Sequence, residues 1–266
     1  MSQPLFEQLA NKGVYESTRF ATPTSERLPK VLQAELTVGC SHNHCTFCDF
    51  YSGVDYKTKS WGEYVDHLNH LWTEVKRVRS PWNLGLERIF IEGGNALSVP
   101  TEELNQSIQA TIVTFAAHTG RLPTRLSMYT NTLDILNKSV EELKQLHCGG
   151  ICGVTPCSIM RFGDRKGLDL IYWGIETGND SLLKEVNKGW GRKELDRAIE
   201  RVRSTRTSHS KLRVSAFVIP GLGGEKFQDS HRYDTVRVLN DLEPDFVNFA
   251  GIEACPGTPY DRRMKK

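Results

Sequence analysis

Three closely spaced cysteines follow an apolar run in the stretch Val31-Leu32-Gln33-Ala34-Glu35-Leu36-Thr37-Val38-Gly39-Cys40-Ser41-His42-Asn43-His44-Cys45-Thr46-Phe47-Cys48. Residues 31–38 alternate enough to predict a first β-strand. The loop behind it has the spacing C-x4-C-x2-C, and cysteine sulfur favours zinc, copper(I) or iron–sulfur clusters. A structural zinc site and a closed cluster each need four ligands, so three thiolates predict a metal centre with one open coordination position.

The chain beyond this stretch alternates strand-like and helical patterns. Strand-like runs follow at 88–92, 125–129, 170–175, 213–218 and 246–250. Helical patterns lie between them, and two of these begin with capping boxes, Ser60-x-x-Glu63 and Ser139-x-x-Glu142. The last helical pattern is marked by Tyr233, Val236, Leu239 and Leu242. Six strands alternating with helices predict an α/β fold with a parallel sheet, either a partial (β/α)6 barrel or an open doubly wound sheet.

No internal repeat, low-complexity segment or linker divides the chain, which predicts a single domain over residues 1–266. Residues 1–29 form a polar lead-in with a short helix around Leu5–Leu9. Residues 148–166 read as an insertion in the connection between a helix and the fourth strand, because such connections usually have 2–6 residues.

Composition sets further limits on the type of protein. The chain is 25% charged and 38% hydrophobic, with a net charge of +2, so bulk electrostatics indicate neither a nucleic-acid nor a membrane partner. The arginine-rich stretch 192–206 also contains Glu194 and Glu200, and we interpret it as a solvated helix face. We find no signal peptide and no membrane span. Seven unevenly spaced cysteines favour a reducing compartment, and we expect a cytoplasmic protein.

The residues that follow each predicted strand carry glycine, small polar or metal-binding side chains. Ligands bind at the carboxyl ends of the strands in parallel α/β folds, so these loops are expected to meet in one site. The six segments are the cysteine loop, Glu92-Gly93-Gly94-Asn95, Thr130-Asn131-Thr132, Glu176-Thr177-Gly178-Asn179, Pro220-Gly221-Leu222-Gly223-Gly224-Glu225 and Cys255-Pro256-Gly257-Thr258-Pro259.

The cysteine loop, with Phe47 directly before its last cysteine, resembles the cluster loop of radical S-adenosylmethionine (radical SAM) enzymes. The commoner family spacing is C-x3-C-x2-C, and the extra residue here resembles a variant of some subfamilies. Gly93-Gly94-Asn95 is similar to the family's Gly-Gly-Glu motif, with Asn95 in place of the glutamate. Three further segments resemble later family motifs, in family order: Gly174-Ile175-Glu176-Thr177, Phe217–Glu225 and Pro256-Gly257-Thr258-Pro259.

This resemblance, over residues 30–260, implies a partial (β/α)6 TIM-like barrel with parallel strands. It implies that Cys40, Cys45 and Cys48 hold a [4Fe-4S] cluster whose open iron is chelated by SAM. Reductive cleavage of SAM would give methionine and a 5′-deoxyadenosyl radical that abstracts hydrogen from a substrate. The residues implied in cofactor binding are Phe47, Gly93, Gly94, Asn95, Asn131, Glu176, Ile219, Pro220 and Gly221.

Several simpler interpretations compete with this one. The loop could bind zinc, pack structurally, or form a plant-type [2Fe–2S] site, although the next cysteine, Cys148, is far along the chain. We interpret His42 and His44 as hydrogen-bonded within the loop or to solvent. Cys148, Cys152 and Cys157 could hold an auxiliary cluster, but their connection lies on the face opposite the site. We therefore interpret them as free thiols, and Cys255 as a passive one.

The sequence does not identify the substrate. The first hypothesis is a radical SAM enzyme of unknown substrate that needs an electron donor such as ferredoxin or flavodoxin. The alternative is a non-catalytic iron–sulfur electron carrier or redox sensor.

Overall fold

The computed structural model describes residues 4–17, 19, 22–78, 85–149, 167–206, 211–251 and 258–264. Cys152, Cys157 and Cys255 lie outside the described residues, and so does most of the predicted insertion. Cys148 is described, and it is buried at the C-terminal end of a helix.

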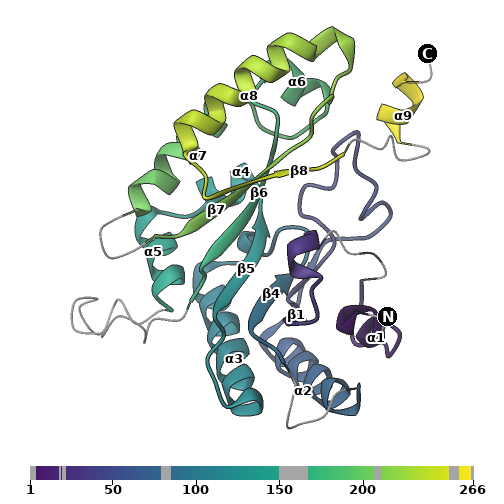
Figure 1. Cartoon of the computed structure of the whole chain (residues 1–266), viewed down its shortest axis with the longest axis vertical. Helices are drawn as coiled ribbons and strands as arrows, with labels where there is room; N and C mark the ends of the chain where they lie inside the picture. Colours follow the sequence, from purple (N-terminus) through teal and green to yellow (C-terminus); the bar gives the residue numbers. More distant parts are fainter. Residues whose placement is uncertain are drawn as a thin grey trace.

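A six-stranded parallel sheet forms the centre of the fold, in the order β1-β4-β5-β6-β7-β8 (Figure 1). Each strand pairs in parallel with the next one in the sheet, so the chain builds a partial TIM-like barrel, as predicted. The strands are β1 (Val31–Glu35), β4 (Arg88–Glu92), β5 (Arg125–Thr130), β6 (Leu170–Glu176), β7 (Arg213–Val218) and β8 (Phe246–Phe249).

The predicted first strand, 31–38, is divided in the structure. β1 ends at Glu35, and the short strand β2 (Thr37–Val38) pairs antiparallel with β3 (Lys57–Thr58) in a separate two-stranded sheet. This small sheet brackets the cysteine loop, because β2 enters the loop and β3 follows it.

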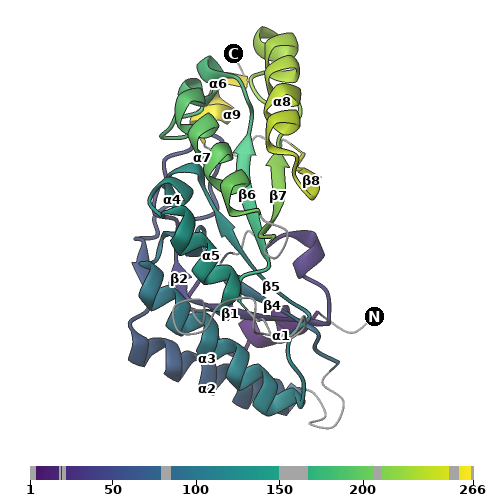
Figure 2. The same cartoon turned by 90° about the vertical axis from the view of Figure 1, so that its left-hand side faces the viewer.

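Helices cover the convex face of the sheet (Figure 2). Their apolar residues and alternate strand residues form the main hydrophobic core, which includes Leu68, Phe115, Ile171 and Val214. No helix of the described residues is long and apolar enough to cross a membrane. The covering helices are α2 (Trp61–Val78), α3 (Thr101–Thr119), α4 (Thr132–Leu136), α5 (Val140–Cys148), α6 (Asp180–Glu185), α7 (Arg192–Thr205) and α8 (Gln228–Leu242).

The last long helix is present as predicted, but the apolar residues that mark it are not all buried. α8 forms where the pattern indicates, but Tyr233 and Val236 are 66% and 51% exposed. The buried face instead contains the polar residues His231 and Thr235 together with Val238 and Leu242. His231 is buried because its ring bonds the Thr177 hydroxyl and the Ile219 carbonyl on neighbouring loops.

The lead-in is part of the packed structure. α1 (Leu5–Ala10) buries Leu5 and Leu9 in the main core. The backbone amides of Glu16 and Ser17 both donate to the Glu35 carboxylate at the end of β1. These contacts hold the lead-in against the first strand of the sheet.

Four aromatic rings cross the concave face of the sheet: Phe90, Tyr129, Tyr172 and Phe217. Their neighbouring centroids lie 5.6–6.0 Å apart. These rings separate the carboxyl ends of the strands from their amino ends.

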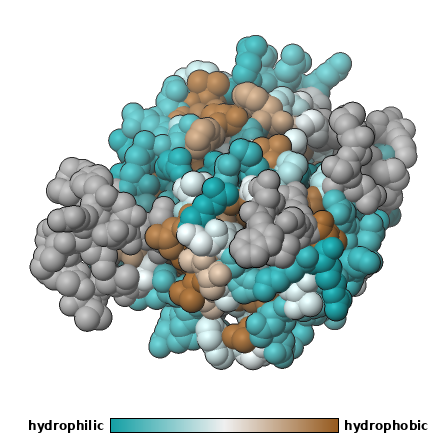
Figure 3. All heavy atoms as spheres, turned by 60° about the horizontal axis from the view of Figure 1, so that its bottom comes forward, coloured by the Kyte–Doolittle hydropathy of each residue, from teal (hydrophilic) through white to brown (hydrophobic). Residues whose placement is uncertain are grey.

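Below the rings, the short helix η1 (Thr24–Glu26) closes the amino-terminal end of the barrel. Glu26 is fully buried, forms an ion pair with Arg125 at the start of β5, and accepts a hydrogen bond of 2.6 Å from the Tyr172 hydroxyl. Figure 3 shows the surface with the bottom of Figure 1 turned forward, where hydrophobic residues form separate patches among hydrophilic ones.

Candidate functional site

The cysteine loop lies at the carboxyl end of the sheet and is fastened to the chain that follows α6. The amide of Thr46 donates to the Val186 carbonyl at 2.9 Å, and the Asn187 side chain donates to the His44 carbonyl at 3.0 Å. The His42 ring bonds the Asn187 carbonyl at 2.6 Å, so its partner lies outside the cysteine loop and not within the loop or in solvent, as the sequence suggested. The loop is therefore fixed by residues about 140 positions further along the sequence.

Two glycines let the end of β4 approach this loop at backbone contact. The Gly94 amide donates to the Gly39 carbonyl at 2.9 Å. A Cβ atom on Gly94 would lie 2.7 Å from the Cβ of Cys40, and one on Gly93 would collide with Thr37. Gly93 also has φ +135°, which side chains rarely adopt. The glycine pair is thus required sterically by the cysteine loop.

Asn95 connects the cysteine loop to α4. Its side-chain oxygen accepts from the Ser41 amide, and its nitrogen donates to the Ser41 hydroxyl and to both oxygens of Asp134. Burial raises the pKa of Asp134 to about 6. Asp134 also closes a capping box with Asn131 at the start of α4. The Asn95 amide is therefore engaged within the protein, and its predicted contact with SAM stays a prediction.

Glu176 ends β6 in a strained conformation. Its φ is +62°, which is rare for a residue with a side chain, and the β6–β7 register shifts between Gly174 and Glu176. The Ile219 amide donates to the Glu176 carbonyl at 3.1 Å. The irregularity turns the Glu176 side chain toward the concave side, where its Oε1 lies 3.3 Å from Lys188 Nζ.

Lys188 is a site residue that the sequence interpretation missed. It is 5% exposed, lies 4.7 Å from the centroid of the Trp190 ring and 5.8 Å from that of Phe47, and pairs with Glu176. Its pKa is raised: burial works to lower it, and the charges of Glu176 and the neighbouring cysteine thiolates outweigh that effect. A buried lysine beside thiols supplies positive charge where an anionic group would bind.

These groups share one cavity of about 510 Å³. Nine of the predicted site residues line it: Cys40, Cys45, Phe47, Cys48, Gly94, Asn95, Asn131, Glu176 and Ile219. Gly93, Pro220 and Gly221 do not: Gly93 supports the loop from behind, and Pro220 and Gly221 form an exposed turn. The lower wall of the cavity is formed by Thr22, Arg27, Tyr129, Phe217 and Asn248.

Three thiols that line one cavity are a donor set that suits an iron–sulfur cluster. Cys40, Cys45 and Cys48 line the same cavity, yet no three His, Cys, Asp or Glu side chains of the described residues are arranged around one metal ion. A four-iron cluster distributes three thiolates over three irons, so it needs no such convergence. Burial raises the pKa of Cys45, and that of Cys48 to about 12, so binding of a cluster must displace protons.

The family model named Radical SAM superfamily matches residues 34–234. The chain belongs to the radical SAM superfamily. Its matched segment contains the three cysteines, the glycine pair, Glu176 and Lys188. Membership of this superfamily implies a [4Fe-4S] cluster and SAM as cofactors.

Several solved structures share the fold of this chain at low sequence identity. The coproporphyrinogen III oxidase HemN from Escherichia coli has 15% identity and a TM-score of 0.53, over 96% of this chain and 55% of HemN. The cobalamin-dependent enzyme OxsB has 17% identity and a TM-score of 0.52, over 88% of this chain and 35% of OxsB. Methylornithine synthase (PylB) has 12% identity and a TM-score of 0.51, over 86% of this chain and 55% of PylB. The chain spans about a third to just over half of the length of these proteins.

A further buried carboxyl group, Glu92, lies behind the cavity at the end of β4. It is 1% exposed, and the Thr22 hydroxyl donates to it. Burial raises the pKa of Glu92 to about 8, with a smaller contribution from the neighbouring Glu35. The carboxyl group is therefore neutral in the folded protein at pH 7.

Replacement of Glu92 by Gln should change how stability depends on pH. Between about pH 4.5 and 8 the unfolded chain has ionised Glu92 while the folded chain keeps it protonated, so the wild type loses stability as pH rises. Relative to the wild type, the free energy of unfolding of E92Q should therefore increase by up to about 1.4 kcal/mol per pH unit in this range. Urea unfolding of the metal-free proteins at pH 5.5, 6.5 and 7.5 measures this. E87Q, at the half-buried surface residue Glu87, is the control and should show no such gain. A parallel pH dependence of E92Q and wild type would contradict the prediction.

Substitution of Gly94 by Ala should abolish cluster binding, because the added Cβ would occupy the space of the Cys40 side chain. Iron and sulfide per chain after anaerobic reconstitution measure the effect. The control is G120A, at the C-cap of α3, where φ is also positive (+70°) but no atom lies within 4 Å of the added Cβ. G120A should lose about 1 kcal/mol of stability and keep its iron. Full iron content in G94A would contradict the steric argument.

Proposed function

We propose that this chain is a radical SAM enzyme with a C-x4-C-x2-C cluster loop, in which Cys40, Cys45 and Cys48 ligate one [4Fe-4S] cluster. The observation that carries the proposal is the shared cavity, which three thiols, Glu176 and Lys188 all line. When bound, the cluster and SAM supply the chemistry of reductive cleavage, which yields methionine and a 5′-deoxyadenosyl radical.

The residues of this chain provide binding and orientation. Lys188 offers the cation for the SAM carboxylate, and Glu176 offers the acceptor for the ribose or the amino group. Lys188 Nζ and Glu176 Oε1 lie 3.3 Å apart, so a cation and an anion stand side by side. This arrangement matches the amino and carboxylate groups of SAM, which carry opposite charges. Phe47 and Ile219, which pack together in a small apolar cluster, flank the adenine.

The lower half of the same cavity is the proposed substrate region. It lies between the SAM groups and the aromatic layer, and Arg27 and Asn248 are its polar walls. Tyr129 and Phe217 form an apolar base, since both belong to the aromatic layer. This region is suited to a small substrate that presents a polar group to the walls and a flat or apolar part to the base.

The test is anaerobic reconstitution with iron and sulfide followed by reduction in the presence of SAM. The proposal expects about four irons per chain and release of 5′-deoxyadenosine. The alternative, an electron carrier or redox sensor, expects reversible reduction of the cluster without any change in its EPR signal when SAM is added. A reconstituted cluster that yields no 5′-deoxyadenosine would decide for the alternative.

Replacement of Lys188 by Met should weaken SAM binding without loss of the cluster. The substitution removes the cation and leaves Glu176 buried without its ion-pair partner, so the dissociation constant of SAM should rise about tenfold or more. Equilibrium dialysis of reconstituted protein measures it, together with iron content. K188R should retain most of the affinity. The control is K184M, which removes an exposed lysine from α6; equal SAM affinity in K188M and K184M would contradict the role of Lys188.

A further inference from the structure

The lower half of the inner cavity is closed below and leaves little room. The whole cavity measures about 510 Å³, and SAM shares it. Sites for one drug-sized ligand usually have about 300–1,000 Å³, and SAM is a ligand of that size. The aromatic layer closes the space below, and Glu26 with Arg125 lies beneath that layer. The second ligand of this cavity must therefore be small.

The charged side chains around this cavity do not balance. Of the described residues that line it, three carry a charge: Arg27, Glu176 and Lys188. Lys188 Nζ and Glu176 Oε1 lie 3.3 Å apart, so these two charges offset each other. Burial lowers the pKa of His42, which leaves this lining histidine neutral at pH 7. Arg27, in the lower half, supplies the excess positive charge.

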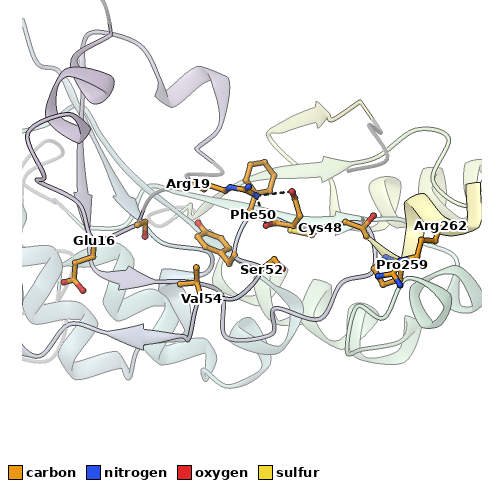
Figure 4. Close-up of a pocket in the computed structure, with 12 residues that line it drawn as sticks. Glu16, Arg19, Cys48, Phe50, Ser52, Val54, Pro259 and Arg262 are labelled. Carbon is orange, nitrogen blue, oxygen red and sulfur yellow. Dashed lines mark hydrogen bonds and ion pairs between the residues drawn. The ribbon is translucent and has the colours of Figure 1, made fainter. Parts of the chain in front are cut away.

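The pocket on the outer side of the cysteine loop has no such excess. It measures about 670 Å³, and its walls come from the lead-in, the loop and α9 (Pro259–Met264) (Figure 4). Its charged side chains are Arg19, Arg262, Glu16 and Asp49, and Arg19 pairs with Asp49 at 3.1 Å. Two positive and two negative groups give this pocket no preference for a charged ligand, in contrast to the lower half of the inner cavity.

Arg27 is held against the lower wall. Its Nε donates to the Thr22 carbonyl at 3.0 Å, and the Thr22 hydroxyl donates in turn to Glu92. The charge of Arg27 acts to lower the pKa of Glu92, but burial dominates and raises that pKa to about 8. Glu92 is therefore neutral at pH 7, and this neighbouring carboxyl group does not offset the charge of Arg27.

Positive charge is also in excess beneath the aromatic layer. The carboxylate of Glu26 forms an ion pair with Arg125, and its second oxygen lies 4.0 Å from Arg88 Nη1. One buried carboxylate thus faces two guanidinium groups. The other pair at this end, Lys30 with Glu87, is balanced. Charges that are partly removed from water are screened less, so both sides of the ring layer favour an anion above it.

The lower wall suits a carboxylate better than a phosphate. Phosphate sites commonly gather several backbone amides in a glycine-rich turn, whereas this wall offers one guanidinium beside the Asn248 side chain. Asn248 itself is held by a hydrogen bond from its nitrogen to the Ser215 hydroxyl. The planar fork of an arginine binds a carboxylate through two parallel hydrogen bonds. The rings of Tyr129 and Phe217, with centroids 5.8 Å apart, offer an apolar base beside this charge.

We propose that the lower half of the cavity takes a small carboxylic acid as its substrate, bound as the anion with its carboxylate on Arg27 and its apolar or flat part on Tyr129 and Phe217. The inference rests on the proposed function, because it assumes that SAM occupies the upper half of the cavity. Arg27 is then the residue that determines specificity, since a site built around a charged hydrogen bond rejects an analogue that lacks the charge.

The experiment compares carboxylates with amides of the same shape. The probes are benzoate against benzamide and hexanoate against hexanamide, titrated by calorimetry into reconstituted, unreduced protein saturated with SAM. Wild type should bind the carboxylate of at least one pair about tenfold more tightly than the amide. R27M should remove this preference while it keeps the iron content and the SAM affinity of wild type, and R27K should retain part of the preference. R197M, which removes an exposed arginine from α7, is the control and should behave as wild type.

The outcomes separate this inference from the function on which it rests. Equal affinity of wild type for carboxylate and amide in both pairs, or an unchanged preference in R27M, would overturn the carboxylate site. Phenylphosphonate that binds more tightly than benzoate would overturn it in favour of a phosphate site. Wild type that forms no 5′-deoxyadenosine on reduction with SAM would instead overturn the proposed function, and this reaction is measured without any of the probes.

Discussion

The contact between the end of β4 and the start of the cysteine loop is the constraint on which the site depends. β1 and β4 are paired in register up to Glu35 and Glu92, so the chain leaves both strands at the same level. Gly94 then lies against Gly39 and Cys40 with no space for a side chain. Because the backbones touch, the loop has a fixed position relative to the sheet, and Asn95 extends the connection to α4 through Ser41 and Asp134.

A buried ion pair forms the opposite wall. Lys188 and Glu176 are both largely removed from water, and burying two charges costs more than their attraction returns unless they are well paired. Their partners here are each other and, for Lys188, the rings of Trp190 and Phe47. Strain in the Glu176 backbone adds to this cost. An arrangement that lowers stability in two ways at one position is typical of a binding site rather than of a packing core.

Much of the fold and part of the site followed from the sequence. The six strands were predictable because the apolar runs and the capping boxes are local signals. Their order was not, since the pattern alone fitted both a partial barrel and a doubly wound sheet, and only the resemblance implied the barrel. The resemblance of the loops also placed the cysteines, Gly94 and Glu176 on one face. Lys188 was not predictable in this way, because it lies after α6, beyond any loop that directly follows a strand. The only sequence signal for Lys188 is its spacing from Glu176. That spacing brings the two side chains together only because the chain between them folds back through α6. The burial of His231 on α8 was not predictable for a similar reason, since it comes from hydrogen bonds to Thr177 and Ile219 rather than from hydrophobicity.

The closed lower end of the barrel has a consequence for kinetics. Glu26, Arg125 and the four aromatic rings make the cavity blind on the side of the strand amino ends. Molecules that bind one above the other in a blind cavity exchange in sequence, because the deeper one leaves only after the upper one has moved. The depth at which each ligand sits therefore determines an obligatory order of binding and release.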